Sequence, residues 1–330
     1  MTAHARIAGW GKYLPDRVMT NAELEGMVET SDEWIRGRSG IGERRIAAPD
    51  ETAATLGLVA AREALAVARV DPADLDLIVV GTSTPDHYAY PSTACLIQAA
   101  LGAERAGAFD LSAACSSFVY GLVVGAQFIQ TGGSRRVLVI GSEVNSRILD
   151  WQDRGTCVLF GDGAGAVVLT STDAPGGLLA FELGADGSRA EALIVPAGGS
   201  RAPASQTTVE QRQHYIRMDG PEVYRFSTLI VPAVVERMCA SAAVEPSAID
   251  LLIPHQANSR IIQSAARRLA LQEGAVFVNL EHYGNTSAAS VPIALCEALE
   301  AGRLQAGQLL ALVGFGAGLT WAGALWRWHE

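Results

Sequence analysis

The residue best suited to covalent chemistry is Cys115, which lies between a short apolar strand and a long apolar helix. The strand is predicted over Phe109–Leu111, and the helix that opens at Cys115 is apolar on nearly every face between Phe118 and Thr131. The first turn of such a helix lies inside the protein, where free backbone N–H groups and the positive end of the helix dipole favour a thiolate. The pattern therefore predicts a lowered pKa and a nucleophilic thiol at Cys115, with an inert buried cysteine as the alternative.

Two further polar positions follow apolar strands in the second half of the chain. His255 comes after the predicted strand Leu251–Ile253, and Asn285 comes after the predicted strand Val276–Val278. Open α/β sheets place their chemistry just beyond the carboxyl ends of the strands. A structural histidine and an asparagine that only caps a turn are the plainer alternatives. Because an internal repeat brings the two halves face to face, we expect Cys115, His255 and Asn285 to converge.

A capping-box pattern at Thr30–Glu33 predicts a short helix that carries Trp34, Arg36 and Arg38. These three side chains either form a solvated face or provide a platform for an adenine ring, with cations for its phosphates. The sequence alone leaves both interpretations open.

The glycine-rich stretch Gly161–Ala166 has the composition of a phosphate-binding loop. Such a loop needs a helix N-terminus directly after it. Here the apolar segment Cys157–Phe160 precedes the glycines and the predicted strand Val167–Thr170 follows them. We therefore predict a tight turn between two strands.

One helix–loop–strand unit of α/β type occurs twice in the chain. The segments Val70–Ile78 and Val244–Leu252 are similar at a displacement of 174 residues. The segments Val137–Gly141 and Leu310–Gly314 are similar at a displacement of 173 residues. Two similarities in nearly one register predict two copies of one α/β motif.

The repeat divides the chain into two predicted halves. Residues 1–172 form the first half, which carries the cysteine, and residues 173–330 form the second, which carries the histidine and the asparagine. The Gly/Ala/Pro-rich stretch at 184–213 is expected to be an insertion or a mobile cap on the second half.

The composition is that of a globular protein. Of the 330 residues, 49% are hydrophobic and 18% are charged, which excludes disorder and predicts a large core or an oligomer interface. The net charge of −10 argues against a general nucleic-acid binder. An acidic partner would have to meet a local cluster of arginines.

Three sequence features favour the cytoplasm. Met1–Thr20 lacks the continuous apolar run of a secretory signal. The five cysteines form no CxxC pair, which favours free thiols in a reducing compartment. The most membrane-like run, Leu309–Trp326, is interrupted by glycines and is better explained by two buried strands joined by a turn at Phe315–Gly318.

Together these motifs resemble the β-ketoacyl-acyl-carrier-protein synthases of type III, which are thiolase-like condensing enzymes. The resemblance runs nearly end to end, and it implies a five-layered αβαβα duplication that works as a homodimer, in agreement with the repeat. The motifs that carry it are, in chain order, Thr30–Ile35, Ala113–Cys115, Asp153–Thr156, Phe160–Gly163, Met218–Gly220, His255–Asn258, Tyr283–Ser287 and Phe315–Gly318.

The resemblance implies a decarboxylative Claisen condensation of an acyl-CoA starter with malonyl-acyl-carrier protein, which initiates fatty acid biosynthesis. It implies that Cys115 accepts the acyl group and that His255 and Asn285 bind the thioester carbonyl of the malonyl substrate. The backbone N–H groups of Cys115 and Ala317 are the candidates for a second oxyanion hole. No metal and no permanently bound cofactor are implied, since acyl-CoA is a substrate.

The resemblance also implies the binding surfaces. Trp34 would stack on the adenine of CoA, and Arg267 and Arg268, with Arg260, would dock the acidic carrier protein. Tyr90 matches a position, usually apolar, that reaches into the acyl pocket of the partner subunit. The residues implied to contact the rest of CoA are Arg38, Arg154, Asn258 and Arg260.

The departures from the family pattern concern the acyl pocket. Ser116 and Ser117 follow the cysteine where many members carry a small residue and then glycine, and Tyr90 adds a hydroxyl, so the preferred starter stays open. One alternative is a type III-like ketosynthase or acyltransferase of polyketide or secondary metabolism. An alternative from a different class is a catalytically silent relative that acts as a binding partner.

Overall fold

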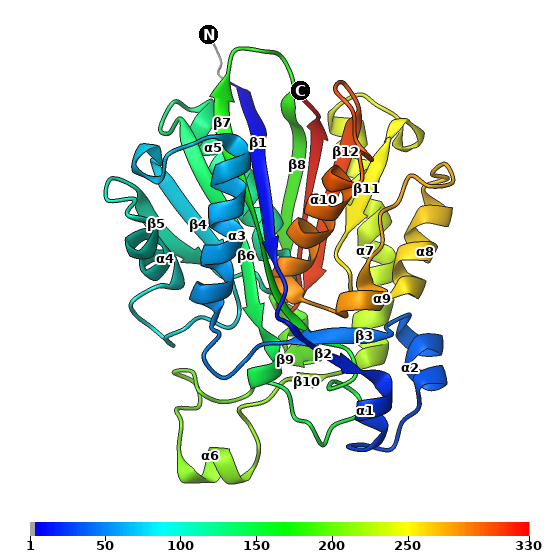
Figure 1. Ribbon diagram of the computed structural model, residues 1–330. Helices are drawn as coiled ribbons and strands as arrows, with labels where there is room; N and C mark the ends of the chain where they lie inside the picture. Colours follow the sequence, from blue (N-terminus) through cyan, green and yellow to red (C-terminus); the bar gives the residue numbers. More distant parts are fainter. Residues whose placement is uncertain (1–3, 330) are drawn as a thin grey trace.

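The computed structural model describes residues 4–329, which form two open sheets with helices between them and on both outer faces (Figure 1). The first sheet has the strand order β1-β7-β6-β4-β5, and the second has the order β11-β12-β13-β8. The strands of the first sheet are β1 (His4–Tyr13), β4 (Leu77–Gly81), β5 (Gly107–Leu111), β6 (Arg136–Val144) and β7 (Asp162–Thr172). Those of the second sheet are β8 (Gly177–Ala185), β11 (Leu251–Pro254), β12 (Leu309–Gly316) and β13 (Thr320–Arg327).

Six helices complete the layers. The middle layer consists of α5 (Ser117–Gln130) and α10 (Ser290–Glu300), which pack against both sheets. The outer face of the first sheet is covered by α3 (Ala53–Ala68) and α4 (Thr93–Leu101), and that of the second by α7 (Gly220–Ser241) and α8 (Ser259–Arg268). The layers therefore alternate in the predicted αβαβα order.

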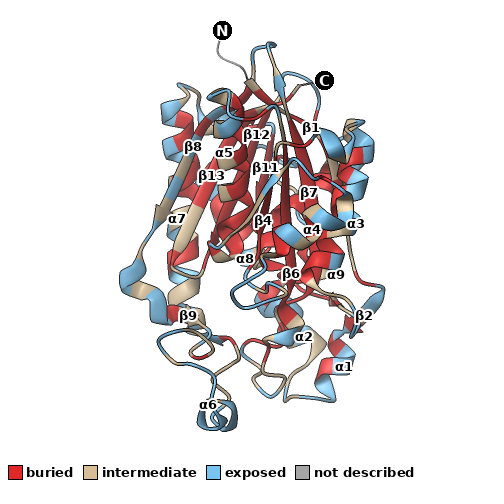
Figure 2. Cartoon of the chain, turned by 90° about the vertical axis from the view of Figure 1, so that its left-hand side faces the viewer, coloured by how far each residue is buried: buried red, intermediate tan, exposed pale blue. Residues whose placement is uncertain are grey.

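Three hydrophobic clusters hold these layers together. The central cluster joins α5 and α10 to both sheets through side chains such as Phe118, Leu122 and Leu295. One outer cluster lies under α3 and α4, and the other lies under α7 and α8. Figure 2 shows buried residues along the strands and on the helix sides that face them. Because α5 is buried along most of its length, its N-terminal end lies inside the protein.

The two repeated segments occupy equivalent places in the two sheets. In each half a 3-10 turn, Pro72–Asp74 or Pro246–Ala248, precedes a strand that pairs in parallel, β4 or β11. Leu77 lies opposite Val137 in the first sheet, just as Leu251 lies opposite Leu310 in the second. The similar sequences therefore build the same strand pair twice. The predicted boundary at residues 172 and 173 falls in the connection between β7 and β8.

The predicted tight turn at Gly161–Ala166 is wrong, because all of this stretch except its first residue lies within β7. A Cβ on Gly165 would lie 2.7 Å from the Cβ of Pro292 and 2.8 Å from the backbone N of Ile293, both in α10. The glycine lets a middle-layer helix approach the strand more closely than any side chain would allow. The glycines therefore serve packing rather than a turn.

The predicted strand Val276–Val278 is reduced to a single bridge between Leu252 and Val276. Beyond this bridge the chain bonds to a side chain instead of a neighbouring strand. Gln256 Nε2 donates to the carbonyl oxygen of Phe277 at 3.3 Å, and the N–H of Asn279 donates to Gln256 Oε1 at 3.1 Å. The buried carboxamide of Gln256 thus takes the place of the backbone hydrogen bonds that a neighbouring strand would make.

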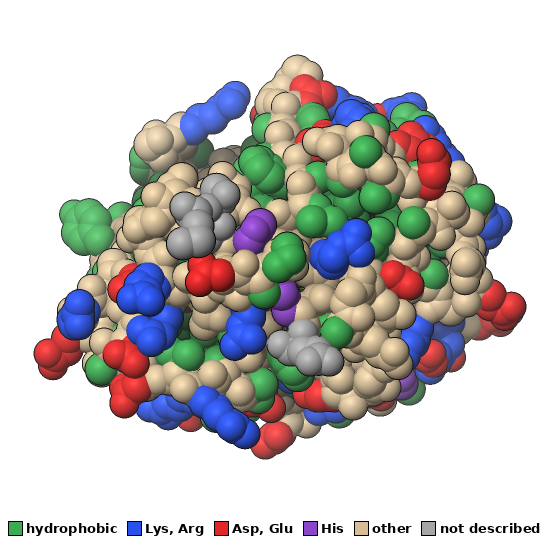
Figure 3. All heavy atoms as spheres, turned by 90° about the horizontal axis from the view of Figure 1, so that it is seen from above, with side chains coloured by type: hydrophobic (Ala, Val, Ile, Leu, Met, Phe, Trp, Pro, Cys, Tyr) green, Lys and Arg blue, Asp and Glu red, His purple; other side chains and the backbone are tan. Residues whose placement is uncertain are grey.

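The predicted insertion lies at the end of the molecule away from the termini (Figure 1). The stretch at 184–213 leaves the second sheet at the end of β8 and carries β9 (Leu193–Ile194), which pairs with β10 (Arg217–Met218), and α6 (Gln206–Glu210). At the opposite end, acidic and basic side chains are interspersed (Figure 3).

The remaining short elements are α1 (Asn21–Glu25), α2 (Asp32–Ser39) and α9 (Leu280–Tyr283), together with β2 (Arg17–Thr20) and β3 (Glu43–Ile46), which pair with each other.

The most apolar run of the chain, Leu309–Trp326, forms β12, a turn and most of β13, as predicted. Both strands are almost entirely buried. Among residues 4–329, no helix has both the length and the apolar character needed to cross a membrane.

Gly165 provides a test of the close packing between β7 and α10. The change Gly165→Ala should lower the free energy of unfolding by about 1–3 kcal/mol, the usual cost of overpacking, because the new methyl group would overlap Pro292 and Ile293. Gly107→Ala is the matched control, since a Cβ at that strand position would meet no other atom closer than 3.5 Å. Urea denaturation measures both variants. Equal stabilities of the two variants would contradict the packing explanation.

Candidate active site

Cys115 lies in a 3-10 turn, Ala114–Ser116, and α5 begins directly after it at Ser117. The α-helix therefore starts two residues later than predicted. Ala114 has a φ of 49°, in the left-handed region that few residues other than glycine adopt. The N–H of Ala113 donates to Ser117 Oγ at 2.8 Å. This turn places the thiol, which is 6% exposed, at the buried end of the helix.

Burial has a larger effect on the pKa of Cys115 than the nearby helix N-terminus. Removal from water raises the pKa of the thiol to about 12, and the Glu143 carboxyl adds to the rise, while the hydroxyl of Ser287 opposes it. The predicted lowering of this pKa is therefore wrong. The group is therefore a thiol rather than a thiolate.

Cys115, His255 and Asn285 line one cavity of about 160 Å³, although they come from both predicted halves of the chain. The packing beside the thiol is close, because a Cβ on Gly316 would lie 3.0 Å from Cys115 Sγ. The three predicted catalytic side chains are thus brought together. The apolar part of the wall includes Leu159, Phe160, Met218, Val223, Ile261 and Phe315.

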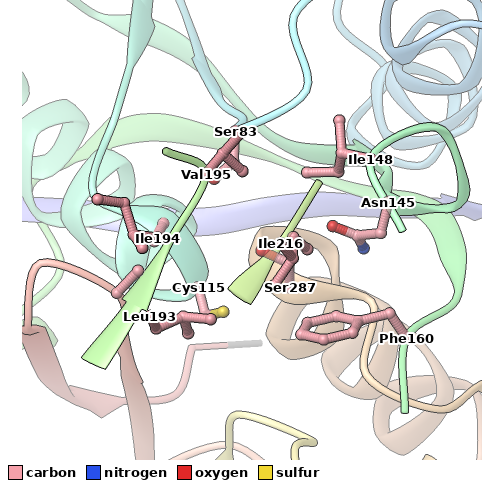
Figure 4. A pocket seen from close by; sticks show the side chains of 12 residues that line it. Ser83, Cys115, Asn145, Ile148, Phe160, Leu193, Ile194, Val195, Ile216 and Ser287 are labelled. Carbon is pink, nitrogen blue, oxygen red and sulfur yellow. The ribbon is translucent and has the colours of Figure 1, made fainter. Parts of the chain in front are cut away.

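A second cavity, of about 120 Å³, shares Cys115 with the first. Figure 4 shows the sulfur pointing into the space between Leu193 and Phe160. Ala317 also lines this cavity, so the predicted oxyanion-hole residue lies beside the thiol. The apolar lining comes largely from the predicted insertion and its surroundings, namely Ile148, Phe160, Leu193, Ile194, Val195 and Ile216.

His255 is a neutral imidazole. It is 1% exposed, and burial lowers its pKa to about 3. Its Nδ1 lies 2.6 Å from Ser290 Oγ, and its ring packs edge-on against Phe315 with the ring centroids 5.1 Å apart. Ser290 Oγ also accepts the N–H of Gln256 at 3.4 Å, and its own hydroxyl proton can be donated to Nδ1. In that arrangement Nε2 of His255 carries the ring proton.

Asn285 has its carboxamide oriented by the local backbone. Its Oδ1 accepts the N–H of Ser287 at 2.8 Å, so the NH₂ group is the part left to donate into the cavity. Its main chain pairs with the segment before β7, donating to Leu159 and accepting from Gly161. Ser287 has a φ of 49° and begins a 3-10 turn that precedes α10.

Trp34 and the arginines predicted to bind CoA form a separate cluster. The Arg154 guanidinium lies 4.4 Å from the centroid of the Trp34 ring, and that of Arg38 lies 5.8 Å from it. Asn258 Nδ2 donates to the carbonyl of Arg38 at 3.0 Å, and Arg260 donates to a neighbouring carbonyl of α2. Trp34, Arg38 and Arg260 line one open pocket. All five predicted residues therefore lie close to one another.

The other predicted binding residues lie on the surface. Arg267 and Arg268 occupy the last turn of α8, where Arg268 Nε lies 3.4 Å from Glu236 Oε1. Tyr90 is 87% exposed and lines neither of the cavities beside Cys115. The chain therefore does not bring Tyr90 to its own thiol.

Sequence reasoning missed Glu143, a fully buried carboxyl that accepts hydrogen bonds beside Cys115. A single acidic residue at the end of the apolar strand β6 was the available signal. It also missed Ser290, because a serine at the start of a helix is usually only a cap.

The chain matches two family models. The model described as 3-oxoacyl-[acyl-carrier-protein (ACP)] synthase III matches residues 109–187, and the model of the C-terminal part of these enzymes matches residues 239–328. The beta-ketoacyl-[acyl-carrier-protein] synthase III of Caldanaerobacter subterraneus subsp. tengcongensis is 51% identical over 326 residues, which cover 99% of this chain and 98% of that protein.

Solved structures agree with this result. The crystal structure of 3-oxoacyl-[acyl-carrier-protein] synthase III from Aquifex aeolicus VF5 has a TM-score of 0.91 and 46% identity, covering 98% of this chain and all of that one. The priming β-ketosynthase of the R1128 polyketide pathway has a TM-score of 0.91 and 38% identity, covering 99% of this chain and 97% of that one. Nearly complete coverage, a shared fold and about half of all residues identical give one conclusion: the chain belongs to the 3-oxoacyl-[acyl-carrier-protein] synthase III family.

Proposed function

We propose that the protein condenses an acyl-CoA with malonyl-acyl-carrier protein, with loss of carbon dioxide, through a thioester on Cys115. The observation that carries this proposal is the cavity in which a buried thiol, a neutral imidazole and a carboxamide meet. The family membership supports it.

In the first half-reaction the Cys115 sulfur attacks the acyl-CoA carbonyl. The thiol proton passes to the departing CoA sulfur, so CoA leaves as a thiol and the acyl group stays on Cys115. The small apolar cavity beside Leu193 and Phe160 would hold that acyl group. The backbone N–H groups of Cys115 and Ala317 would donate to the oxyanion of each tetrahedral intermediate.

In the second half-reaction the malonyl thioester loses carbon dioxide, and the electron pair moves to the thioester oxygen as an enolate. Nε2–H of His255 and the NH₂ of Asn285 would donate to that oxygen. The low pKa of His255 supports this role, because a neutral imidazole held as a donor needs no proton from solvent. The enolate carbon then attacks the acyl thioester, and the Cys115 sulfur leaves as a thiolate that takes up a proton from solvent, the one proton that the overall condensation consumes.

The proposed substrate contacts extend beyond the cavity. CoA would lie on Trp34, with Arg38, Arg154, Asn258 and Arg260 around it, and the carrier protein would dock on Arg260, Arg267 and Arg268. The net charge supports this docking face, because a protein of net charge −10 needs a local group of arginines to attract an acidic carrier protein.

We further propose that the protein works as a homodimer in the cytoplasm. β5 is an edge strand of the first sheet, and the nearby Tyr88 and Tyr90 are 75% and 87% exposed, so a second copy would cover an apolar edge. Tyr90 would then reach the acyl cavity of that copy. All five cysteines are free thiols, which fits a reducing compartment.

A priming ketosynthase of a polyketide pathway is the second candidate function. The likeness to the R1128 enzyme favours it, and the two candidates share the same chemistry. They differ in the starter acyl group and in the fate of the product.

The acyl-enzyme provides the direct test of the proposed function. Incubation with acetyl-CoA should add one acetyl group per chain at Cys115, and Cys115→Ala should abolish that addition, because the four other thiols do not line the cavity. Intact-protein mass spectrometry with peptide mapping measures both. Acetylation that persists in the Cys115→Ala variant would rule out the assignment.

The docking face has its own test. Reversing Arg267 and Arg268 to glutamate should raise the KM for malonyl-acyl-carrier protein and leave acetylation by acetyl-CoA nearly unchanged. The same reversal at the exposed Arg62 and Arg135 changes the net charge equally at distant sites and should leave that KM unchanged. An equal rise of KM in both double variants would mean that net charge, and not this face, attracts the carrier.

Asn285→Asp separates a condensing enzyme from a simple acyltransferase. The carboxylate keeps the acceptor for the N–H of Ser287 but replaces the donor NH₂ with negative charge beside the forming enolate. We expect Cys115 acetylation to continue and release of labelled carbon dioxide to fall about a hundredfold or more. Carbon dioxide release at the parent rate would remove Asn285 from this step. A parent enzyme that releases none, but passes acetyl to an alcohol or amine, would instead be a transferase.

A further inference from the structure

Glu143 is a buried carboxyl at the end of β6 for which the proposed chemistry has no role. It is fully shielded from solvent, and it accepts hydrogen bonds from both halves of the chain. From the first half, the N–H of Ser83 lies 3.1 Å from both carboxyl oxygens and Thr84 Oγ1 lies 2.7 Å from Oε2. From the second half, Ser287 Oγ lies 2.9 Å and the N–H of Ala288 lies 3.4 Å from Oε1.

These partners match an ionised carboxylate. Backbone N–H groups can only donate, and the three hydroxyls in contact, those of Thr82, Thr84 and Ser287, have protons to donate, so every contact can use the carboxyl as an acceptor. Burial raises the pKa of Glu143, while the hydrogen bonds from Thr84, Ser83 and Ser287 act in the opposite direction.

Ser287 connects this carboxylate to the catalytic carboxamide. Its hydroxyl donates to Glu143, and its backbone N–H donates to Asn285 Oδ1 at 2.8 Å. Its φ of 49° is an unfavourable conformation for serine, so it requires outside support. Glu143 supplies that support from the end of β6 in the first sheet.

We propose that Glu143 is a positioning residue, whose carboxylate holds Ser287 so that the NH₂ of Asn285 faces the enolate oxygen. This inference rests on the proposed function. Without the carboxylate, Ser287 is free to leave its strained conformation, and the Asn285 carboxamide loses the partner that fixes which of its ends points into the cavity. The decarboxylation step should then suffer, because it is the step that uses the NH₂ group.

Acylation of Cys115 should respond differently. The negative charge of Glu143 raises the pKa of the nearby thiol, so its removal does not hinder loss of the thiol proton. Loss of Glu143 is therefore expected to slow decarboxylation without slowing acylation, whereas a general disturbance of the fold would slow both.

The test compares Glu143→Ala with Glu143→Gln in the full-length protein, using acetyl-CoA for acylation and labelled malonyl-acyl-carrier protein for decarboxylation. Glu143→Ala should lower kcat for carbon dioxide release about tenfold or more, with acetylation of Cys115 at or above the parent rate. Glu143→Gln keeps an oxygen for Ser287 and Ala288 and can turn its NH₂ towards the Thr84 hydroxyl. It should therefore stay within about threefold of the parent.

Ser287→Ala keeps the test decisive if Glu143→Ala fails to fold. It removes the hydroxyl that joins Ser287 to the carboxylate, so carbon dioxide release should fall as in Glu143→Ala. Because the same hydroxyl lowers the pKa of the Cys115 thiol, acylation should slow as well, by less than carbon dioxide release. Asp162→Asn is the matched control, since Asp162 is also a buried carboxyl that accepts two backbone N–H groups, from Ala47 and Ser146, but reaches neither Ser287 nor Asn285. Any loss in that variant should affect both half-reactions alike.

Three results would overturn the inference: parent-like carbon dioxide release in Glu143→Ala, an equal loss in Glu143→Gln, or a parallel loss of acylation. The proposed function fails separately, if the parent protein itself neither acetylates Cys115 nor releases carbon dioxide.

Discussion

Desolvation of the space between the two sheets governs the chemistry of this protein. The central cluster packs α5 and α10 against both sheets, and the turns that precede these helices therefore lie away from water. Burial keeps the Cys115 thiol and the His255 imidazole neutral, although an exposed pair of this kind is often drawn as thiolate and imidazolium. In such a place each hydrogen-bond donor acts more strongly on a developing oxyanion than it would in water. In the proposed mechanism the groups that face the developing oxyanions are therefore fixed neutral donors.

Much of the fold was accessible from the sequence, because it depends on patterns of a few residues. The repeat of Val70–Ile78 at Val244–Leu252 predicted two copies of one motif, and the paired strands lie at equivalent positions in the two sheets. Cys115, His255 and Asn285 each follow an apolar segment of the sequence, which is why they could be recognised as candidates. The cavity that they share needed the structure, since it depends on how the two halves pack.

What escaped prediction depends on contacts between distant segments. The glycines at Gly161–Gly165 have the composition of a turn, and only the closeness of α10 explains Gly163 and Gly165 as parts of a strand. The pKa of Cys115 was predicted in the wrong direction because a helix start is visible in a sequence and the depth of burial is not. Glu143 was missed for a similar reason, since its partners lie about 60 and 144 residues away along the chain.

The two positive φ angles have a consequence for the symmetry of the molecule. Ala114 and Ser287 share a φ of 49° and are separated by 173 residues, the displacement of the second repeated segment. The same unusual turn therefore occurs twice, ahead of α5 and ahead of α10, and the two turns touch. The residue that follows the first is Cys115, and the residue that follows the second is Ala288. The two turns thus provide two equivalent positions, one holding the thiol of Cys115 and the other the methyl group of Ala288. No second thiol lies in the equivalent position, so the repeat offers Cys115 no symmetric partner with which to form a disulfide.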